Sequence, residues 1–171
     1  KAIRRQRQMC IRDRVYINGT DIFAMNDDEL AIFRRRQVGI IYQFYNLIPI
    51  LNVEENMAIP MELDGRKVEK AQMDDMLLRL GLTERRTHLP NELSGGQQQR
   101  TSIGRALITR PSIVLADEPT GNLDTKASNE IMHLLKTSNR ELNQTIIMIT
   151  HNMELAKAAD RTIMIEDGKI R

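Results

Sequence analysis

Two carboxylates follow a short apolar run late in the chain. Residues 113–116, Ile-Val-Leu-Ala, lead directly into Asp117 and Glu118. A buried strand that ends this way places carboxylates at the carboxyl edge of a parallel sheet, where ligands bind in open α/β folds. One acid can hold a metal-bound water, and the other can orient or deprotonate a nucleophilic water. Pro119 fixes the turn that follows, which favours a shaped site over a solvated strand end.

The glycine-rich segment 93–97, Leu-Ser-Gly-Gly-Gln, is a second candidate. Ser94 can cap a following helix, and Gln97 stands where a capping box places its partner. Gly95 and Gly96 let backbone N–H groups approach an anion closely, and the helix dipole favours a phosphate there. From these residues alone, a plain capping box and a phosphate site are equally good interpretations.

Polar residues also end two other apolar runs. His151 follows residues 146–150, where it could contact a terminal phosphate, although a lone histidine there more often only caps a strand. Gln43 ends the run 38–42 and could ligate a metal or sense water, but by itself it would indicate nothing. His88 and His133 have no comparable setting, and we assign them no role.

Alternating strands and helices must position these side chains. The apolar runs 113–116 and 145–149 are typical of parallel strands buried on both faces, and 38–42 is a compact strand of the buried type. The residues between 47 and 107 have a helical pattern, with one amphipathic helix that stops near Gly81. The other expected elements are helices at 27–36, 126–139 and 153–159, a strand at 15–17 before an Asn18-Gly19 turn, and a strand and turn at 163–168. This order predicts an α/β fold with a parallel sheet and an inserted helical subdomain.

Composition and charge narrow the class of protein. The 171 residues are 41% hydrophobic and 28% charged, which is ordinary for a globular protein, and no apolar run approaches the length of a membrane span. Six basic residues and one acid lie within 1–14, so the net charge of +2 comes from this segment. We expect residues 1–14 to be a basic tail outside the fold. Because the excess charge comes from this tail, it is poor evidence for nucleic-acid binding. With only 4% aromatic residues, platforms for base stacking are also not expected. The single cysteine, Cys10, excludes an internal disulfide and fits a reducing cytosol.

Taken together, the motifs follow the order found in the ATP-binding-cassette ATPases, and the chain resembles that family over residues 15–171. The resemblance rests on the segment 93–97, the strand that ends in Asp117-Glu118, the segment Asn122-Leu123-Asp124 and the histidine at 151. It implies a P-loop NTPase-like parallel sheet core, incomplete here, with a helical signature subdomain at about 47–107. It also implies that the chain uses ATP and Mg²⁺.

The resemblance assigns roles to individual residues. The resemblance implies that Glu118 is the general base for the attacking water and that His151 is a catalytic switch at the γ-phosphate. It implies that Asp117 and Gln43 bind Mg²⁺ and that Gln43 also senses the membrane partner. The residues implied to bind nucleotide are Gln43, Ser94, Gly95, Gly96, Gln97 and Asp124. Of these, the signature residues 94–97 would cap the γ-phosphate of nucleotide held by the opposite subunit. Asp124 would lie with Asn122 at the dimer seam.

Three further segments resemble the lipoprotein-release and macrolide-export branch, close to the cell-division ATPase: 46–49, 55–56 and 117–124. This branch implies a cytoplasmic protein, peripheral on the inner face of the cell membrane. Its partners would be a permease and a second ATPase subunit, with no nucleic acid. A coupling helix of the permease would dock at 44–53. Alternatively, Phe44 and Tyr45 pack within the helical subdomain, and the sequence does not decide between the two.

One departure from the family concerns activity. No G-x-x-x-x-G-K-[ST] occurs in the 171 residues, and the family needs that loop to grip phosphate. We therefore expect a truncated fragment that is inactive alone, with the interior edge of the sheet exposed. Gly104 is a smaller oddity, because glycine inside a helix costs about 1 kcal/mol relative to alanine.

Two alternative functions remain. The chain could be a non-catalytic subunit that lends its signature in trans to a complete partner. A DNA-repair or chromosome-structure ATPase is less favoured, because no sustained heptads separate Gln43 from Ser94. The transported substrate cannot be read from the sequence, because selectivity belongs to the membrane subunit.

Overall fold

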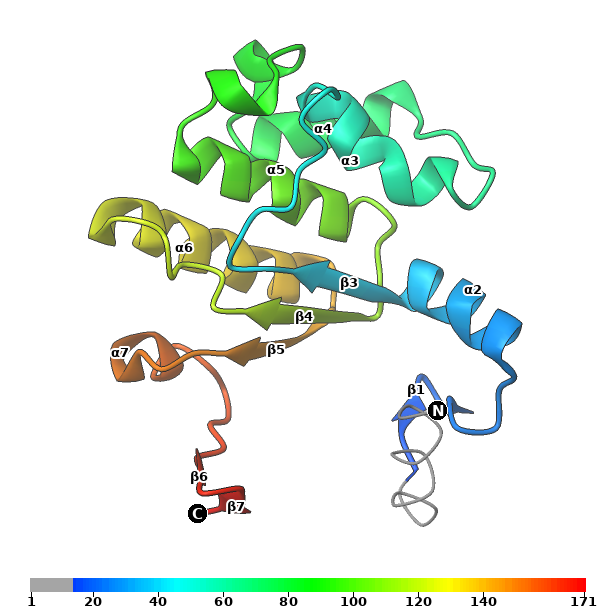
Figure 1. Cartoon of the computed structure of the whole chain (residues 1–171), viewed down its shortest axis with the longest axis vertical. Coiled ribbons are helices and arrows are strands. Elements are labelled where there is room, and N and C mark those ends of the chain that lie inside the picture. Colours follow the sequence, from blue (N-terminus) through cyan, green and yellow to red (C-terminus); the bar gives the residue numbers. More distant parts are fainter. Residues whose placement is uncertain (1–13) are drawn as a thin grey trace.

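A three-stranded parallel sheet lies at the centre of the computed structural model, which describes residues 14–171 (Figure 1). The strands are β3 (Val38–Ile41), β4 (Ile113–Asp117) and β5 (Thr145–Ile149), in the order β3-β4-β5. This confirms the predicted α/β fold with a parallel sheet. The predicted basic tail lies outside the described residues, except for Arg14.

Two edges of this sheet have no partner strand within residues 14–171, and the exposed interior edge expected from the sequence stays a prediction. Strand β4 pairs with β3 on one side, from Val38↔Ile113 to Ile41↔Ala116, and with β5 on the other, from Ile113↔Thr145 to Asp117↔Ile149. Its backbone groups are therefore used on both sides, and the unpaired edges of this sheet are the outer sides of β3 and β5.

Helices α5 (Gly95–Leu107) and α6 (Thr125–Glu141) cover the same face of the sheet (Figure 1). Val114 and Ala116 point into this face and are almost completely buried, in one core with residues of both helices. Strand β3 approaches α5 so closely that a Cβ on Gly39 would lie 2.6 Å from the carbonyl oxygen of Ala106. A glycine is therefore required at this crossing.

The opposite face of the sheet is uncovered within residues 14–171. Four of its side chains, at alternate positions of the three strands, are large and apolar, with exposures of 42%, 38%, 49% and 63% for Ile40, Leu115, Ile147 and Ile149. The expectation that these strands are buried on both faces is wrong for the described residues. Continuous apolar sequence predicts burial on both faces, but both covering helices pack on one face.

The predicted helical stretch 47–107 contains α3 (Val53–Glu62), α4 (Lys70–Arg79), two short 3₁₀ turns at Thr83–Arg85 and Pro90–Glu92, and α5. Helix α4 ends as predicted, with Gly81 at φ 63° directly after its C-cap. The packing also explains Gly104. A Cβ there would lie 2.6 Å from Met57 Cε and 2.7 Å from Leu80 Cδ1, and both of these side chains are fully buried.

Smaller elements complete the chain. Helix α2 (Asp27–Gln37) begins at an Asn26 capping box, and the predicted Asn18-Gly19 turn joins β1 (Tyr16–Ile17) to β2 (Thr20–Asp21). Helix α7 (Met153–Ala156) is shorter than predicted. The last predicted strand is reduced to a hairpin of β6 (Ile165–Glu166) and β7 (Lys169–Ile170). Within residues 14–171, no helix is both long enough and apolar enough to cross a membrane.

Candidate functional site

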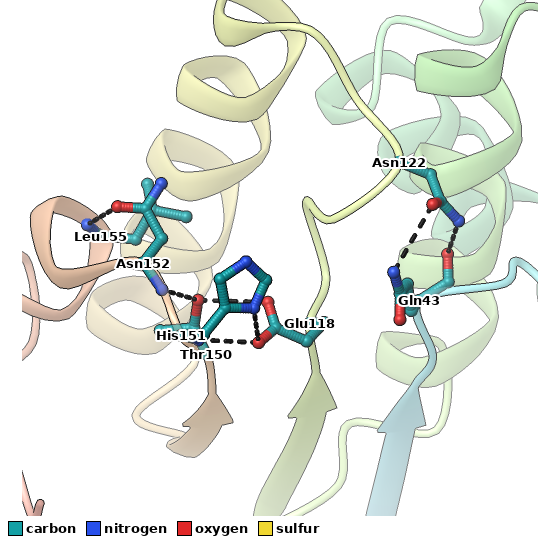
Figure 2. Close-up of polar contacts among 7 residues, drawn as sticks. All are labelled: Gln43, Glu118, Asn122, Thr150, His151, Asn152 and Leu155. Atoms are coloured by element: carbon teal, nitrogen blue, oxygen red, sulfur yellow. Dashed lines mark hydrogen bonds and ion pairs between the residues drawn. The ribbon is translucent and has the colours of Figure 1, made fainter.

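The carboxyl ends of β3, β4 and β5 bring the predicted polar residues to one edge of the sheet. Figure 2 shows two groups there: Glu118 with Thr150 and His151, and Gln43 with Asn122. Because neighbouring parallel strands run in the same direction, residues that follow each strand meet at this edge. The structure thus brings Glu118 to His151 and places Gln43 in a separate group with Asn122.

Three donors surround the Glu118 carboxylate. Oε1 accepts hydrogen bonds from the backbone N and from Nδ1 of His151, both at 2.7 Å, and Oε2 accepts one from Thr150 Oγ1 at 3.2 Å. Because an ionised carboxylate only accepts, Nδ1 of His151 carries the proton in this contact. The Glu118 side chain is 17% exposed, whereas that of His151 is 84% exposed. The histidine therefore covers the carboxylate from the solvent side.

An unusual backbone conformation aims Glu118 at this contact. Its φ is 43°, in the left-handed region, which costs about 1–3 kcal/mol for a residue other than glycine. Its backbone N donates to Ile149 O at 2.9 Å, and its carbonyl accepts from Gly121 N at 3.0 Å. These bonds hold the strained turn that carries the chain out of β4. Sequence reasoning missed Thr150, although a hydroxyl directly before a strand-end histidine was the available signal.

The second group joins the end of β3 to the loop after β4. Asn122 Nδ2 donates to the backbone carbonyl of Gln43 at 3.1 Å, and Gln43 Nε2 lies 3.5 Å from Asn122 Oδ1. Gly121 makes room for this contact, since a Cβ there would lie 2.8 Å from Gln43 Nε2. The amide nitrogen of Gln43 is used by Asn122, so its Oε1 remains available to a cation or water.

Asp117 differs from its neighbour Glu118. It is exposed at the end of β4, and its carboxylate has no hydrogen bond or ion pair with any described residue. A free carboxylate here and the Oε1 of Gln43, just after the adjacent strand β3, are oxygen donors of the kind Mg²⁺ takes, together with several waters. These residues fit the predicted metal site. No cluster of three or more His, Cys, Asp or Glu suited to a metal occurs in 14–171, so the ion would rely on water and phosphate oxygens.

The glycine-rich segment forms the N-terminus of α5. Ser94 Oγ accepts from Gln97 N at 3.3 Å, and Gln97 Oε1 accepts from Ser94 N at 2.9 Å, which confirms the predicted capping box. Gly95 is closely covered, because a Cβ there would lie 2.8 Å from Tyr45 Oη. Capping and phosphate binding are compatible here, because the backbone N–H groups of the first turn still point out of the helix. Asp124 also acts as a cap, with its Oδ1 accepting from Ala127 N at 2.8 Å at the start of α6.

Arg105, which sequence reasoning missed, holds the loop after Gln43 by hydrogen bonds to its backbone. Its guanidinium donates to Tyr45 O at 2.9 Å and Asn46 O at 2.6 Å, and burial lowers the pKa of Arg105. Phe44 and Tyr45, for which docking of a permease and packing within the helical subdomain were the alternatives, differ in their exposure. Tyr45 is half-buried against Gly95, whereas Phe44 is 69% exposed.

Comparison with known proteins gives a consistent result. The family model described as "ABC transporter" matches residues 1–121. The chain is 46% identical over 162 residues to the ABC transporter ATP-binding protein YtrE of Bacillus subtilis, covering 94% of this chain and 70% of YtrE. It is 44% identical over 158 residues to the lipoprotein-releasing system ATP-binding protein LolD of Cytophaga hutchinsonii, covering 91% and 72%.

Solved structures show the same similarity. A dimeric post-hydrolysis structure of the ATP-binding cassette MJ0796, bound to ADP and Pi, superposes with a TM-score of 0.79 at 38% identity, covering 92% of this chain and 70% of that one. A second dimeric structure of the same cassette gives a TM-score of 0.77 at 39% identity.

Proposed function

The chain belongs to the ABC transporter family of ATP-binding proteins, and from this membership we propose that it is a nucleotide-binding subunit that energises a membrane permease. The observation that carries this proposal is the contact of Glu118 with His151 and Thr150 beside the unpaired Asp117. It joins a candidate general base to a candidate switch residue at the edge where ligands bind in α/β sheets.

Glu118 is built to receive a proton from water. A carboxylate offers about four acceptor positions, and three of them are used by Thr150 and His151. The remaining position is on Oε2. A water bound there can pass its proton to Glu118 as it attacks the γ-phosphate. His151, mostly exposed, can turn toward the phosphate without disturbing the backbone N–H that also holds Glu118.

Asp117 and Gln43 are the residues we propose for Mg²⁺. When bound, the ion neutralises charge on the β- and γ-phosphates. Asp117 would hold it through its free carboxylate, and Gln43 through Oε1, with its nitrogen retained by Asn122. The contact with Asn122 thus presents the correct atom of Gln43.

We also propose the partners and location. Dimeric assembly, as in the MJ0796 structures, would let the N-terminus of α5 face nucleotide on the opposite subunit. LolD belongs by name to a lipoprotein-releasing system, and a similar export role would place this chain on the cytoplasmic face of a membrane, beside a permease. The exposed Phe44 and Ile50, at 69% and 83%, fit a permease contact on the loop that Arg105 holds.

A complementation assay tests the nucleotide role. The 171 residues contain no G-x-x-x-x-G-K-[ST], so we expect the purified chain alone to release no phosphate from Mg-ATP. The probe is complete YtrE with its own signature serine replaced by arginine. Adding this chain should restore ATP turnover, because its α5 would supply the missing signature. Turnover by the chain alone that disappears in Glu118→Gln would contradict the first expectation, and failure to restore YtrE would contradict the second.

A second assay, on this chain assembled with its own permease, separates the alternative function, a non-catalytic subunit that only donates its signature. Under that alternative, Glu118→Gln in this chain leaves the restored turnover unchanged in every assembly, including one with its permease. If the chain is a catalytic subunit, Glu118→Gln lowers turnover in its own transporter.

A further inference from the structure

Gln99 is a fully buried polar residue in the second turn of α5, at 0% exposure. Its Nε2 donates to the carbonyl of Pro119 at 2.7 Å and, more weakly, to the carbonyl of Tyr42 at 3.4 Å. Both partners are carbonyls, so the orientation of the amide is fixed by its contacts. One side chain on α5 therefore holds the backbone at the ends of both β3 and β4.

The two carbonyls are adjacent to residues of the candidate site. Tyr42 immediately precedes Gln43, and Pro119 immediately follows Glu118. Within residues 14–171, no side-chain hydrogen bond or ion pair joins the Gln43 group to the Glu118 group (Figure 2). Gln99 is thus a direct link from the helix that begins at Ser94 to both of them.

Stability alone does not favour glutamine at this position. Its Oε1 is buried and has no hydrogen-bond partner among residues 14–171. A buried acceptor without a partner is costly, and an apolar side chain of the same length avoids that cost. What methionine could not provide is the pair of N–H groups directed at Tyr42 and Pro119.

We infer that Gln99 is a positioning residue that sets the spacing of Gln43 and Glu118 relative to each other and to the N-terminus of α5. A shift of α5 on contact with nucleotide would move the Gln99 amide and, through it, both strand ends. Asn122 supports the same junction from the loop side. The inference rests on the proposed function only for the roles of Gln43 and Glu118.

The test uses ¹⁵N-labelled 171-residue chain without nucleotide. Gln99→Met removes both donors at nearly constant volume. We expect its urea midpoint to stay close to that of the unchanged chain, while NMR signals of the Gln43 and Asn122 side-chain amides and of the Glu118 backbone amide shift. Gln98→Met is the matched control, because Gln98 is the neighbouring glutamine on α5 and its side chain donates, among residues 14–171, only to Leu93 O at 3.2 Å. It should leave those three signals in place.

Signals that stay unchanged in Gln99→Met would overturn the inference and leave Gln99 a packing residue. If Gln99→Met does not fold, hydrogen exchange in the unchanged chain tests the inference instead. The Gln99 side-chain amide protons should exchange with solvent roughly tenfold or more slowly than those of Gln98. Equal exchange rates would overturn the inference. Because no nucleotide is present, failure of the YtrE complementation leaves this result standing, and the converse also holds.

Discussion

Ser94 combines two roles that substitution can separate. Its hydroxyl caps α5 by accepting from Gln97 N, and the same helix end is the proposed phosphate contact in trans. An alanine there removes the cap and the hydroxyl together. An aspartate keeps a capping oxygen and suits the positive end of the helix dipole, but it places a negative charge where phosphate would bind.

We predict that Ser94→Ala lowers the free energy of unfolding by about 1 kcal/mol, whereas Ser94→Asp leaves it nearly unchanged. Urea denaturation measures both. In the YtrE assay, Ser94→Asp should abolish the restored turnover although the protein is folded. Full turnover with Ser94→Asp would show that this helix end does not face phosphate.

Some side-chain contacts in the site could be predicted from the sequence, and others could not. The capping box follows from the S-x-x-Q spacing, which is local and is read directly. The contact between Glu118 and His151 has a different origin, because it depends on the pairing of β4 with β5 and on a positive φ at Glu118. Neither is encoded in the spacing of the two residues, so only their shared sheet edge could be inferred.

Among the elements, α2 is attached to the end of α3 by Arg35, which donates to Leu63 O at 2.7 Å, and by the buried carboxylate of Asp64. The Asp64 side chain is 2% exposed, and it pairs with Arg36 Nε at 2.9 Å and Arg66 Nε at 2.7 Å. Burial alone would raise the pKa of Asp64, but the hydrogen bonds and charges of Arg36 and Arg66 outweigh it and lower the pKa. The ionised form is therefore the one that holds the two elements together.

Asp64→Asn should lower the thermal midpoint at neutral pH, since it removes this charge. A depressed pKa contributes stability that is fully present above the ordinary carboxyl value of 3.8 and is lost as the pH falls through the lower native value. The difference between Asp64→Asn and the unchanged chain should therefore shrink as the pH is lowered below 3.8. Thermal melts across pH measure it, with Asp75→Asn as the control, because its pair with Arg79 is about half exposed and should contribute little. A difference that persists at low pH would assign the effect to packing.

For the whole molecule, the sequence predicted which strands form but not how the sheet is covered. Alternating apolar and polar positions would have indicated one exposed face, yet β4 is apolar up to its last residue, Asp117, and β5 is apolar after its first, Thr145. The sequence of the covering helices also did not predict which face of the sheet they cover, because α5 and α6 are both amphipathic and could pack on either face. Side assignment is a property of the connections and needs the structure.

The uncovered face leads to a prediction about neighbouring positions in the sheet. Val114 is fully buried beneath the helices, whereas Ile147 is 49% exposed on the opposite face. Val114→Thr keeps the shape but buries a hydroxyl, which should cost about 1–3 kcal/mol. Ile147→Thr should change the free energy of unfolding by no more than about 0.5 kcal/mol, as for other surface substitutions. Urea denaturation of the two variants compares the faces directly. If Ile147→Thr costs as much as Val114→Thr, the face that carries Ile147 is covered in solution and the sheet is buried on both sides, as its apolar strands predict.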